Sequence, residues 1–253
     1  MKRHTGEKPH PPAGNSAAVV ERLGTEEVSA LSKWRVVFSK TGMGKYISHL
    51  DLLRCFTRAI QRSGLPVVYS QGFNPHQKMT FSLPLPIGVT SECESVDIQF
   101  EDGLNPAEIQ EKLNQNLPMD MKVLAVHEPV AKAADIVSAE YQMRAITDKV
   151  VKETALREFF GTGEILVTKK TKKKGEKQIN LMEYLHAWEV EDIAEDGFTL
   201  RVVLSAGGER NLKPDILAGA MEKLLTDAEI SDWEIHRRKI FWKDEKGIQR
   251  IFD

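Results

Sequence analysis

The order of the strands and helices that the sequence predicts indicates an α+β fold. Short runs of β-branched and aromatic residues alternate with stretches of helical spacing, and this order occurs on both sides of a short segment at residues 131–135. The 253 residues also exceed a common single domain of roughly 100–150 residues. We therefore expect two tandem ferredoxin-like (βαββαβ) units, in which helices cover one face of an antiparallel sheet.

The first unit is expected at residues 33–130. Ser48 stands at the N-cap position of its first helix, Asp51 completes a capping box three residues later, and Gly64 ends the helix. The predicted strands are 34–39, 65–69, 79–83, 95–100 and 121–127, and the predicted helices are 48–63 and 105–116.

The second unit is expected at residues 136–243. Its predicted strands are 141–146, 164–168, 179–188, 198–205 and 235–242, and its predicted helices are 151–160 and 213–225. Residues 1–32 combine proline and glycine with polar side chains, so we expect a mobile tail there. Residues 244–253 are expected to form a C-terminal tail.

Composition excludes several classes of protein. No run of about 18 apolar residues could span a bilayer, and the first residues lack the apolar segment of a signal peptide, so we expect a cytoplasmic protein without a membrane partner. Cys55 and Cys93 are the only cysteines, whereas an iron–sulfur cluster needs about four. No GxSxG, GxxxxGK or HExxH motif occurs. We therefore expect no cofactor, no metal site and no catalytic residue that a motif identifies.

Charge is distributed unevenly along the chain. Residues 34–78 hold seven basic side chains against one acid, a balance of +6, although the whole chain has a formal net charge of −2. Residues 79–128 hold two lysines against nine acids, a balance of −7. This asymmetry predicts one surface that faces a polyanion and another that faces solvent.

Three arginines recur at four-residue spacing in the first helix. Arg54, Arg58 and Arg62 fall on the face opposite the predicted apolar face, which holds Leu52, Leu53, Phe56, Ala59 and Ile60. One interpretation is the solvated face of an amphipathic helix. We favour a phosphate-binding stripe, because the arginines lack acidic partners apart from Asp51 and an anion would relieve their repulsion.

The segment after this helix carries residue types that single-stranded RNA sites use. Aromatic rings stack on bases, amides read base edges, and cations contact phosphates. Phe73 has a second interpretation, as an apolar anchor of its loop. The predicted nucleic-acid-binding residues are Lys45, Arg54, Arg58, Arg62, Tyr69, Phe73, Asn74, His76 and Lys78.

Two further stretches are basic. Residues 169–177 hold six lysines and one glutamate on a turn, which is either a soluble hairpin tip or a phosphate clamp. His236, Arg237, Arg238 and Lys239 lie on the last predicted strand. Because successive strand residues face opposite ways, at most half of these four are expected to share a surface.

Three motifs carry a resemblance to a known family. SHLDLLR (48–54), YSQGFNPH (69–76) and SLPLPIGV (82–89) resemble the bacterial radical-SAM-associated proteins, a domain of unknown function, and the resemblance extends over most of the chain from about Ser32. It implies a standalone accessory protein that is encoded beside a radical-SAM protein, since the chain has no CxxxCxxC motif of its own. The predicted fold is also similar to that of CRISPR repeat-processing endonucleases, which bind RNA between two such units.

Three functions remain open at this point. The leading hypothesis is a non-catalytic RNA-binding module that acts on tRNA or rRNA or presents it to a radical-SAM partner. A metal-independent endoribonuclease is the enzymatic alternative, with His49 or His76 as general acid or base. The third is a docking subunit of a radical-SAM protein without nucleic acid.

Overall fold

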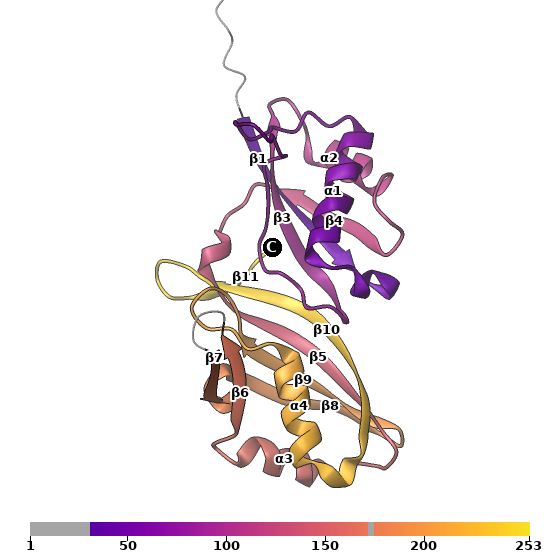
Figure 1. Ribbon diagram of the computed structural model, residues 1–253, viewed down its shortest axis with the longest axis vertical. Helices are drawn as coiled ribbons and strands as arrows, with labels where there is room; N and C mark the ends of the chain where they lie inside the picture. The colour runs from indigo at the N-terminus through magenta and orange to yellow at the C-terminus, as the bar shows by residue number, and fades with distance from the viewer. Residues whose placement is uncertain (1–30, 172–174) are drawn as a thin grey trace, which may run out of the picture. The chain divides into compact units, whose positions relative to one another are not determined.

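The computed structural model describes residues 31–171 and 175–253, and residues 31–253 form one compact unit. The helices are α1 (His49–Ser63), α2 (Pro106–Asn114), α3 (Glu153–Gly161) and α4 (Pro214–Leu224) (Figure 1). The strands are β1 (Leu31–Lys40), β2 (Met79–Phe81), β3 (Val89–Glu101), β4 (Met121–His127), β5 (Ile136–Thr147), β6 (Leu166–Thr171), β7 (Gly175–Asn180), β8 (Leu185–Ala194), β9 (Gly197–Ser205), β10 (Ile230–Lys243) and β11 (Gln249–Ile251). The predicted α+β class is confirmed.

Nine of the described strands form one mostly antiparallel sheet. Its order is β4-β1-β3-β10-β5-β9-β8, with β2 beside β3 and β11 beside β10 (Figure 1). The two halves are joined where β10 pairs with β3 in parallel, through Ile235 opposite Val89 and Arg237 opposite Ser91. Strands β6 and β7 form a separate hairpin. The division of the chain into two domains around residues 131–135 stays a prediction.

Helix α1 forms as its sequence predicts. The Ser48 hydroxyl accepts a hydrogen bond from the backbone N–H of Asp51, and Gly64 ends the helix in the left-handed conformation with φ 67°. The buried side chains are Leu52, Phe56, Ala59 and Ile60. Leu53, which was expected on the same face, is exposed instead, because it lies at the edge of that face. One face of α1 is thereby committed to the core, and its arginines are left on the outside.

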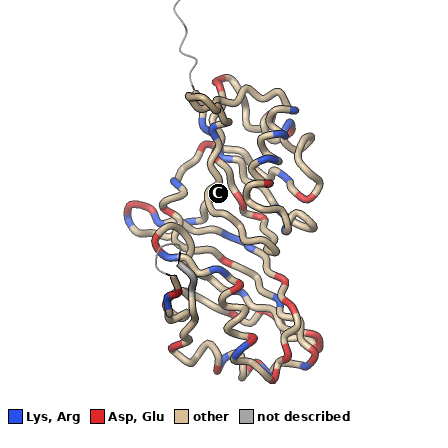
Figure 2. Tube along the Cα trace, viewed as in Figure 1, with Lys and Arg blue, Asp and Glu red and all other residues tan. Residues whose placement is uncertain are grey.

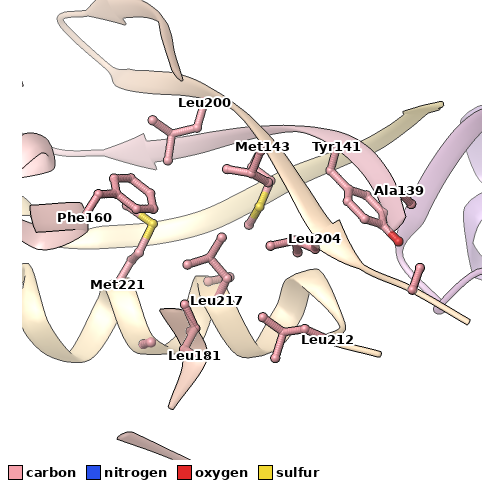
Figure 3. Packing of buried hydrophobic residues seen from close by; sticks show 14 of the residues in the cluster. Ala139, Tyr141, Met143, Phe160, Leu181, Leu200, Leu204, Leu212, Leu217 and Met221 are labelled. Carbon is pink, nitrogen blue, oxygen red and sulfur yellow. The ribbon is translucent and has the colours of Figure 1, made fainter. Parts of the chain in front are cut away.

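The apolar side chains form two clusters. The first lies between α1, α2 and the strands β1, β3 and β4, and its centre includes Phe38 and Phe56, with 4.8 Å between their ring centroids. The second lies between α3, α4 and the strands β5 and β9. Figure 3 shows Met143, Leu204 and Leu217 among the side chains of this second cluster. Residues Tyr141 and Met143 belong to this core, so the alternating residues Gln142 and Arg144 lie on the opposite face of the sheet.

Several predicted boundaries were wrong. Strand β1 begins at Leu31, three residues before the predicted start, and the rest of the predicted tail lies outside the described residues. Residues 65–69 pair only through isolated bridges, Val67 with Phe100 and Tyr69 with Gln77. Hydrogen bonds join Val68 and Pro66 to β3, but Pro66 has no N–H to donate, so no regular ladder forms.

The predicted C-terminal tail is also ordered in part. Strand β11 pairs with β10, and Phe252 is buried. The guanidinium of Arg35 lies 4.0 Å from the centre of the Phe252 ring and makes an ion pair with Asp97, with 2.8 Å between Arg35 Nε and Asp97 Oδ1. A buried cation therefore holds this end of the chain against β1.

Candidate functional site

The exposed face of α1 carries the three predicted arginines, and Figure 2 shows basic positions along this helix. Arg54 Nη1 lies 2.8 Å from Asp51 Oδ1, and Arg62 donates through Nη2 to the Asn116 carbonyl. Arg58 is exposed and makes no ion pair with any residue that the structure describes. Arg58 and Arg62 thus keep charges that no described carboxylate offsets.

In the loop after α1, residues 70–76, hydrogen bonds join the two ends, and the residues at the tip are exposed. The Ser70 N–H donates to the His76 carbonyl at 2.8 Å, and the Ser70 hydroxyl lies 2.8 Å from His76 Nδ1. Phe73 at the tip is fully exposed, at 105% of its reference area. Because none of the residues that the structure describes covers its ring, Phe73 does not act as an apolar anchor of the loop within this part of the chain.

Gln77 ties this loop to α1. Its side chain is buried and donates through Nε2 to the Thr57 carbonyl at 3.3 Å, one residue before Arg58. Tyr69, which is 42% exposed, pairs with Gln77 across the base of the loop, and Lys78 follows it with an exposed side chain. The base of the loop is therefore hydrogen-bonded to α1, whereas Arg62 contacts Asn116 beyond the end of α2.

Lys45, also predicted to bind nucleic acid, lies apart from the arginines of α1 and the loop. It lies in a short 3-10 turn, η1 (Gly42–Tyr46), and lines a hollow of about 470 Å³ where β3 meets β10. This hollow also holds Thr90, Arg144 and His236, with 2.8 Å between His236 Nδ1 and the Thr90 hydroxyl. The hollow lies on the sheet face that the apolar clusters do not cover, and sequence reasoning missed it because its residues come from separate strands.

The basic residues 236–239 on β10 do not alternate between the two sheet faces as predicted. A bulge between Arg237 and Lys239 interrupts the pairing with β5, so His236, Arg238 and Lys239 all reach acids on the uncovered face. Three of the four residues therefore share a surface, not two. The partners are Glu92 for His236, Glu191 for Arg238 and Glu140 for Lys239. Acids neutralise most of this patch, so it is not an open phosphate site.

Of these four basic residues, Arg237 is the one whose side chain lies on the core side of the sheet, in a buried polar cluster. Its Nη2 lies 3.0 Å from Glu94 Oε1, and both side chains are buried. Lys40 is also buried, and its Nζ donates to the Ile47 carbonyl at 2.9 Å. Burial lowers the pKa of Lys40, against the attraction of Glu94. We define Lys40, Glu94 and Arg237 as the junction cluster.

Two neutral groups adjoin the junction cluster. Burial, reinforced by the charge of Glu94, raises the pKa of the Cys93 thiol to about 12. Burial also raises the pKa of the Tyr141 hydroxyl. Both groups are therefore protonated at neutral pH and add no negative charge.

Sequence reasoning missed the junction cluster, although a signal was present. Each member stands two positions from an apolar residue of the same strand face: Lys40 from Phe38, Glu94 from Val96, and Arg237 from Ile235. A charged residue in phase with a core face is costly to bury unless it is paired. Such a residue indicates a buried ion pair or a site.

The described residues contain no group of three or more His, Cys, Asp or Glu side chains that could hold a metal ion. No helix in the part of the chain that the structure describes is long and apolar enough to cross a membrane. The expected absence of a bound metal or cofactor stays a prediction, which elemental analysis of the purified protein tests.

Comparison with solved structures found matches at low sequence identity and with TM-scores below 0.5. One is the structure of a Cbf5–Nop10–Gar1 complex, with a TM-score of 0.46, 13% identity, and coverage of 85% of this chain and 51% of that one. Another is an H/ACA RNP bound to a substrate RNA containing 2′-deoxyuridine, with a TM-score of 0.46, 13% identity, and coverage of 85% and 50%. The chain thus spans about half the length of these two relatives.

A third structure, an unknown protein from Galdieria sulphuraria, has a TM-score of 0.24 and 12% identity over 82% of this chain and 99% of that one. No curated protein matches the chain. The bacterial family described as "uncharacterized protein conserved in bacteria (DUF2344)" matches residues 33–214. The match covers most of the sequence, including α1, the loop and β3, and the chain therefore belongs to this family.

Proposed function

We propose that this protein is a non-catalytic RNA-binding module that acts in the cytoplasm on tRNA or rRNA. It binds through the α1–loop surface, which we define as Arg54, Arg58, Arg62, Tyr69, Phe73, Asn74, His76 and Lys78. The observation that carries the proposal is the full exposure of Phe73 at the tip of a loop that is hydrogen-bonded to the basic helix. An exposed aromatic ring on a loop that is hydrogen-bonded to a helix with uncompensated cations suits RNA, in which a base stacks on the ring and phosphates contact the cations.

The charges on this surface favour a polyanion over a small ligand. Arg58 and Arg62 have no carboxylate partner among the described residues, and Lys78 is exposed close to the loop. Arginine forks match phosphate geometry, and spaced cations match the repeat of an RNA backbone. The backbone would give most of the affinity, and Phe73 and Asn74 would contact bases.

Salt-dependent binding tests the cationic part of the proposal. Arg58→Gln removes an exposed charge from α1 and keeps a good helix former, so the fold is expected to survive. The slope of log affinity against log salt should fall by roughly 0.7 for single-stranded RNA, as measured by fluorescence anisotropy. Arg157→Gln is the matched control, because Arg157 is an exposed helical arginine of α3 that is already paired with Glu153. An unchanged slope in the folded Arg58 variant would remove α1 from the RNA site.

A second candidate is docking of a radical-SAM protein, as the family resemblance implies. The observation that favours it is a group of exposed apolar side chains near the start of α1: Met43 at 71%, Tyr46 at 56%, Leu50 at 66% and Ile87 at 64%. The Gly88 N–H donates to the Lys45 carbonyl at 2.9 Å and holds Ile87 beside η1. Leu50→Ser should weaken capture of a co-expressed radical-SAM protein while RNA affinity is retained. Loss of RNA affinity alone would count against docking.

No contact favours the endoribonuclease alternative. The ring of His49 packs edge-on against Phe81, with 5.4 Å between centroids, and His76 Nδ1 is engaged with Ser70. We expect bound RNA to remain intact, as judged by gel electrophoresis.

We also interpret both halves of the sheet as ferredoxin-like units. The antiparallel order β4-β1-β3-β2 in the first half is repeated as β10-β5-β9-β8 in the second, with the β6–β7 hairpin inserted after α3. This repeated order supports tandem βαββαβ units whose sheets are fused through β3 and β10.

A further inference from the structure

A cavity of about 170 Å³ adjoins the junction cluster, away from the α1–loop surface. Its walls are largely apolar and include Pro84 and Pro86 of the SLPLPIGV motif and Pro214 at the start of α4. The polar side chains on its wall include Arg237, Tyr141 and Lys213. A small apolar pocket with a few convergent polar groups is typical of a site that orients a small ligand.

Arg237 is incompletely satisfied in this wall. The residue is fully buried, and its Nη2 donates to the Leu83 carbonyl at 3.2 Å and lies near Glu94. Its Nε and Nη1 have no hydrogen-bond partner among the residues that the structure describes. Glu94 Oε1, 3.0 Å from Nη2, also has no hydrogen-bond partner among these residues, so the Glu94 carboxylate does not saturate the guanidinium. Since buried polar groups are almost always hydrogen-bonded, the two remaining donors, Nε and Nη1, indicate room for a further acceptor in the wall of the cavity.

The charge of the junction cluster points to the same conclusion. Lys40 and Arg237 are two buried cations, and Glu94 is the one buried carboxylate between them, so the cluster has a formal excess of one positive charge. Cys93 and Tyr141 remain neutral and do not offset it. A buried net charge is costly unless an opposite charge joins it, and an anion in the cavity would supply that charge.

Helix α4 begins at the mouth of the cavity. Pro214 is at its first position, and the side chain of the N-cap residue Lys213 makes no capping hydrogen bond. The positive end of the helix dipole therefore lies at this wall, which the exposed residue Lys213 also lines. Asp215 in the first turn is exposed and opposes this field, and its negative charge also acts on the Tyr141 hydroxyl in the cavity wall.

We propose that this cavity binds a small oxyanion, a phosphate that is either free or carried on a nucleoside. Arg237 holds two oxygens through Nε and Nη1, and Lys213 contacts the anion from the mouth. Pro84, Pro86 and Pro214 form a rigid rim that keeps water away from the Arg237 guanidinium. The site is independent of RNA binding at α1.

Calorimetric titration with inorganic phosphate and with uridine monophosphate, at matched ionic strength, tests the proposal. We expect one saturable site per chain. Lys213→Gln should weaken binding roughly tenfold, since a hydrogen bond to a charged group is lost. Lys223→Gln, near the other end of α4, removes the same charge and should leave affinity unchanged.

The two ligands separate the possible sources of the phosphate. Binding of phosphate alone assigns the site to the free ion, and binding of the nucleotide alone assigns it to a phosphate ester. Arg237→Lys should abolish binding. If that variant does not fold, Tyr141→Phe tests another side chain of the cavity wall and should reduce the affinity for phosphate. Absence of binding by both ligands, or equal affinity in the Lys213 and Lys223 variants, would overturn the proposal.

Discussion

Arg237 of β10 and Glu94 of β3 form an ion pair across the junction of the two halves, with 3.0 Å between Nη2 and Oε1 and with both side chains buried. The pair connects two strands that are more than 140 residues apart in sequence. It lies directly beside the parallel pairing that fuses the sheet. The fold therefore depends on a charged contact at the point where its two cores meet.

Removal of the carboxylate should be strongly destabilising. Glu94→Gln leaves Arg237 and Lys40 buried without a counter-charge, and breaking such a pair costs about 3–5 kcal/mol. Urea denaturation should show this loss in the free energy of unfolding. Glu189→Gln, which breaks an exposed ion pair with Arg201, should cost at most about 1 kcal/mol. Equal effects of the two substitutions would show that the buried pair does not support the junction.

Two glycines should respond in opposite ways to alanine. A Cβ at Gly197 would lie 2.0 Å from the Ala145 carbonyl oxygen of the neighbouring strand, so Gly197→Ala should lower the melting temperature. A Cβ at Gly219, inside α4, meets nothing within 4 Å, so Gly219→Ala should stabilise the helix by about 0.5–1 kcal/mol. Differential scanning calorimetry measures both shifts. A melting temperature that Gly197→Ala leaves unchanged would contradict the close approach of β5 and β9.

The Cys93 thiol should be inert at neutral pH. Its pKa is raised to about 12, so the thiolate that reacts with alkylating agents is scarce below that value. In a Cys55→Ser variant, the rate of iodoacetamide labelling of the native protein should stay low at pH 8 and rise only near pH 12. Labelling at pH 8 as fast as that of a free peptide thiol would contradict the burial of Cys93.

The same shift affects stability at alkaline pH. A folded-state pKa above the usual value of about 9 means that the folded protein keeps the proton longer than the unfolded chain does. The contribution of Cys93 to stability is therefore complete below about pH 9 and is lost as pH rises toward 12. Cys93→Ser should make the unfolding free energy less dependent on pH in that window.

Local signals in the sequence predicted most of the elements, because they lie within a few residues of one another. Ser48, Asp51 and Gly64 define α1, and Met121 to His127 alternates as β4 does. The fused sheet was not predictable in this way, since the pairing of β3 with β10 joins residues far apart in sequence. The strand predicted at residues 65–69 is present only as isolated bridges. Its β-branched residues favour a strand, but Pro66 cannot donate a hydrogen bond to a regular ladder.

The candidate sites also differ in whether their residues are close together in the sequence. The exposure of the arginines on α1 could be predicted because helical spacing is local, and Phe73 is exposed in the loop, whereas their role as an RNA site stays a prediction. The junction cluster could not be assembled from the sequence, since Lys40, Glu94 and Arg237 come from three strands. The basic run on β10 was misjudged because a bulge, which strand alternation does not foresee, changes the direction of its side chains.

The affinity of the Phe73→Ala variant for single-stranded RNA tests the central claim most directly. Stacking of a base on an aromatic ring contributes about 1–3 kcal/mol, so binding should weaken by roughly 5-fold to 150-fold while the salt slope stays the same. Met119→Ala is the matched control, because Met119 is another fully exposed apolar side chain outside the α1–loop surface, and its removal should leave affinity unchanged. Equal RNA affinity in the wild type and the folded Phe73 variant would contradict the account.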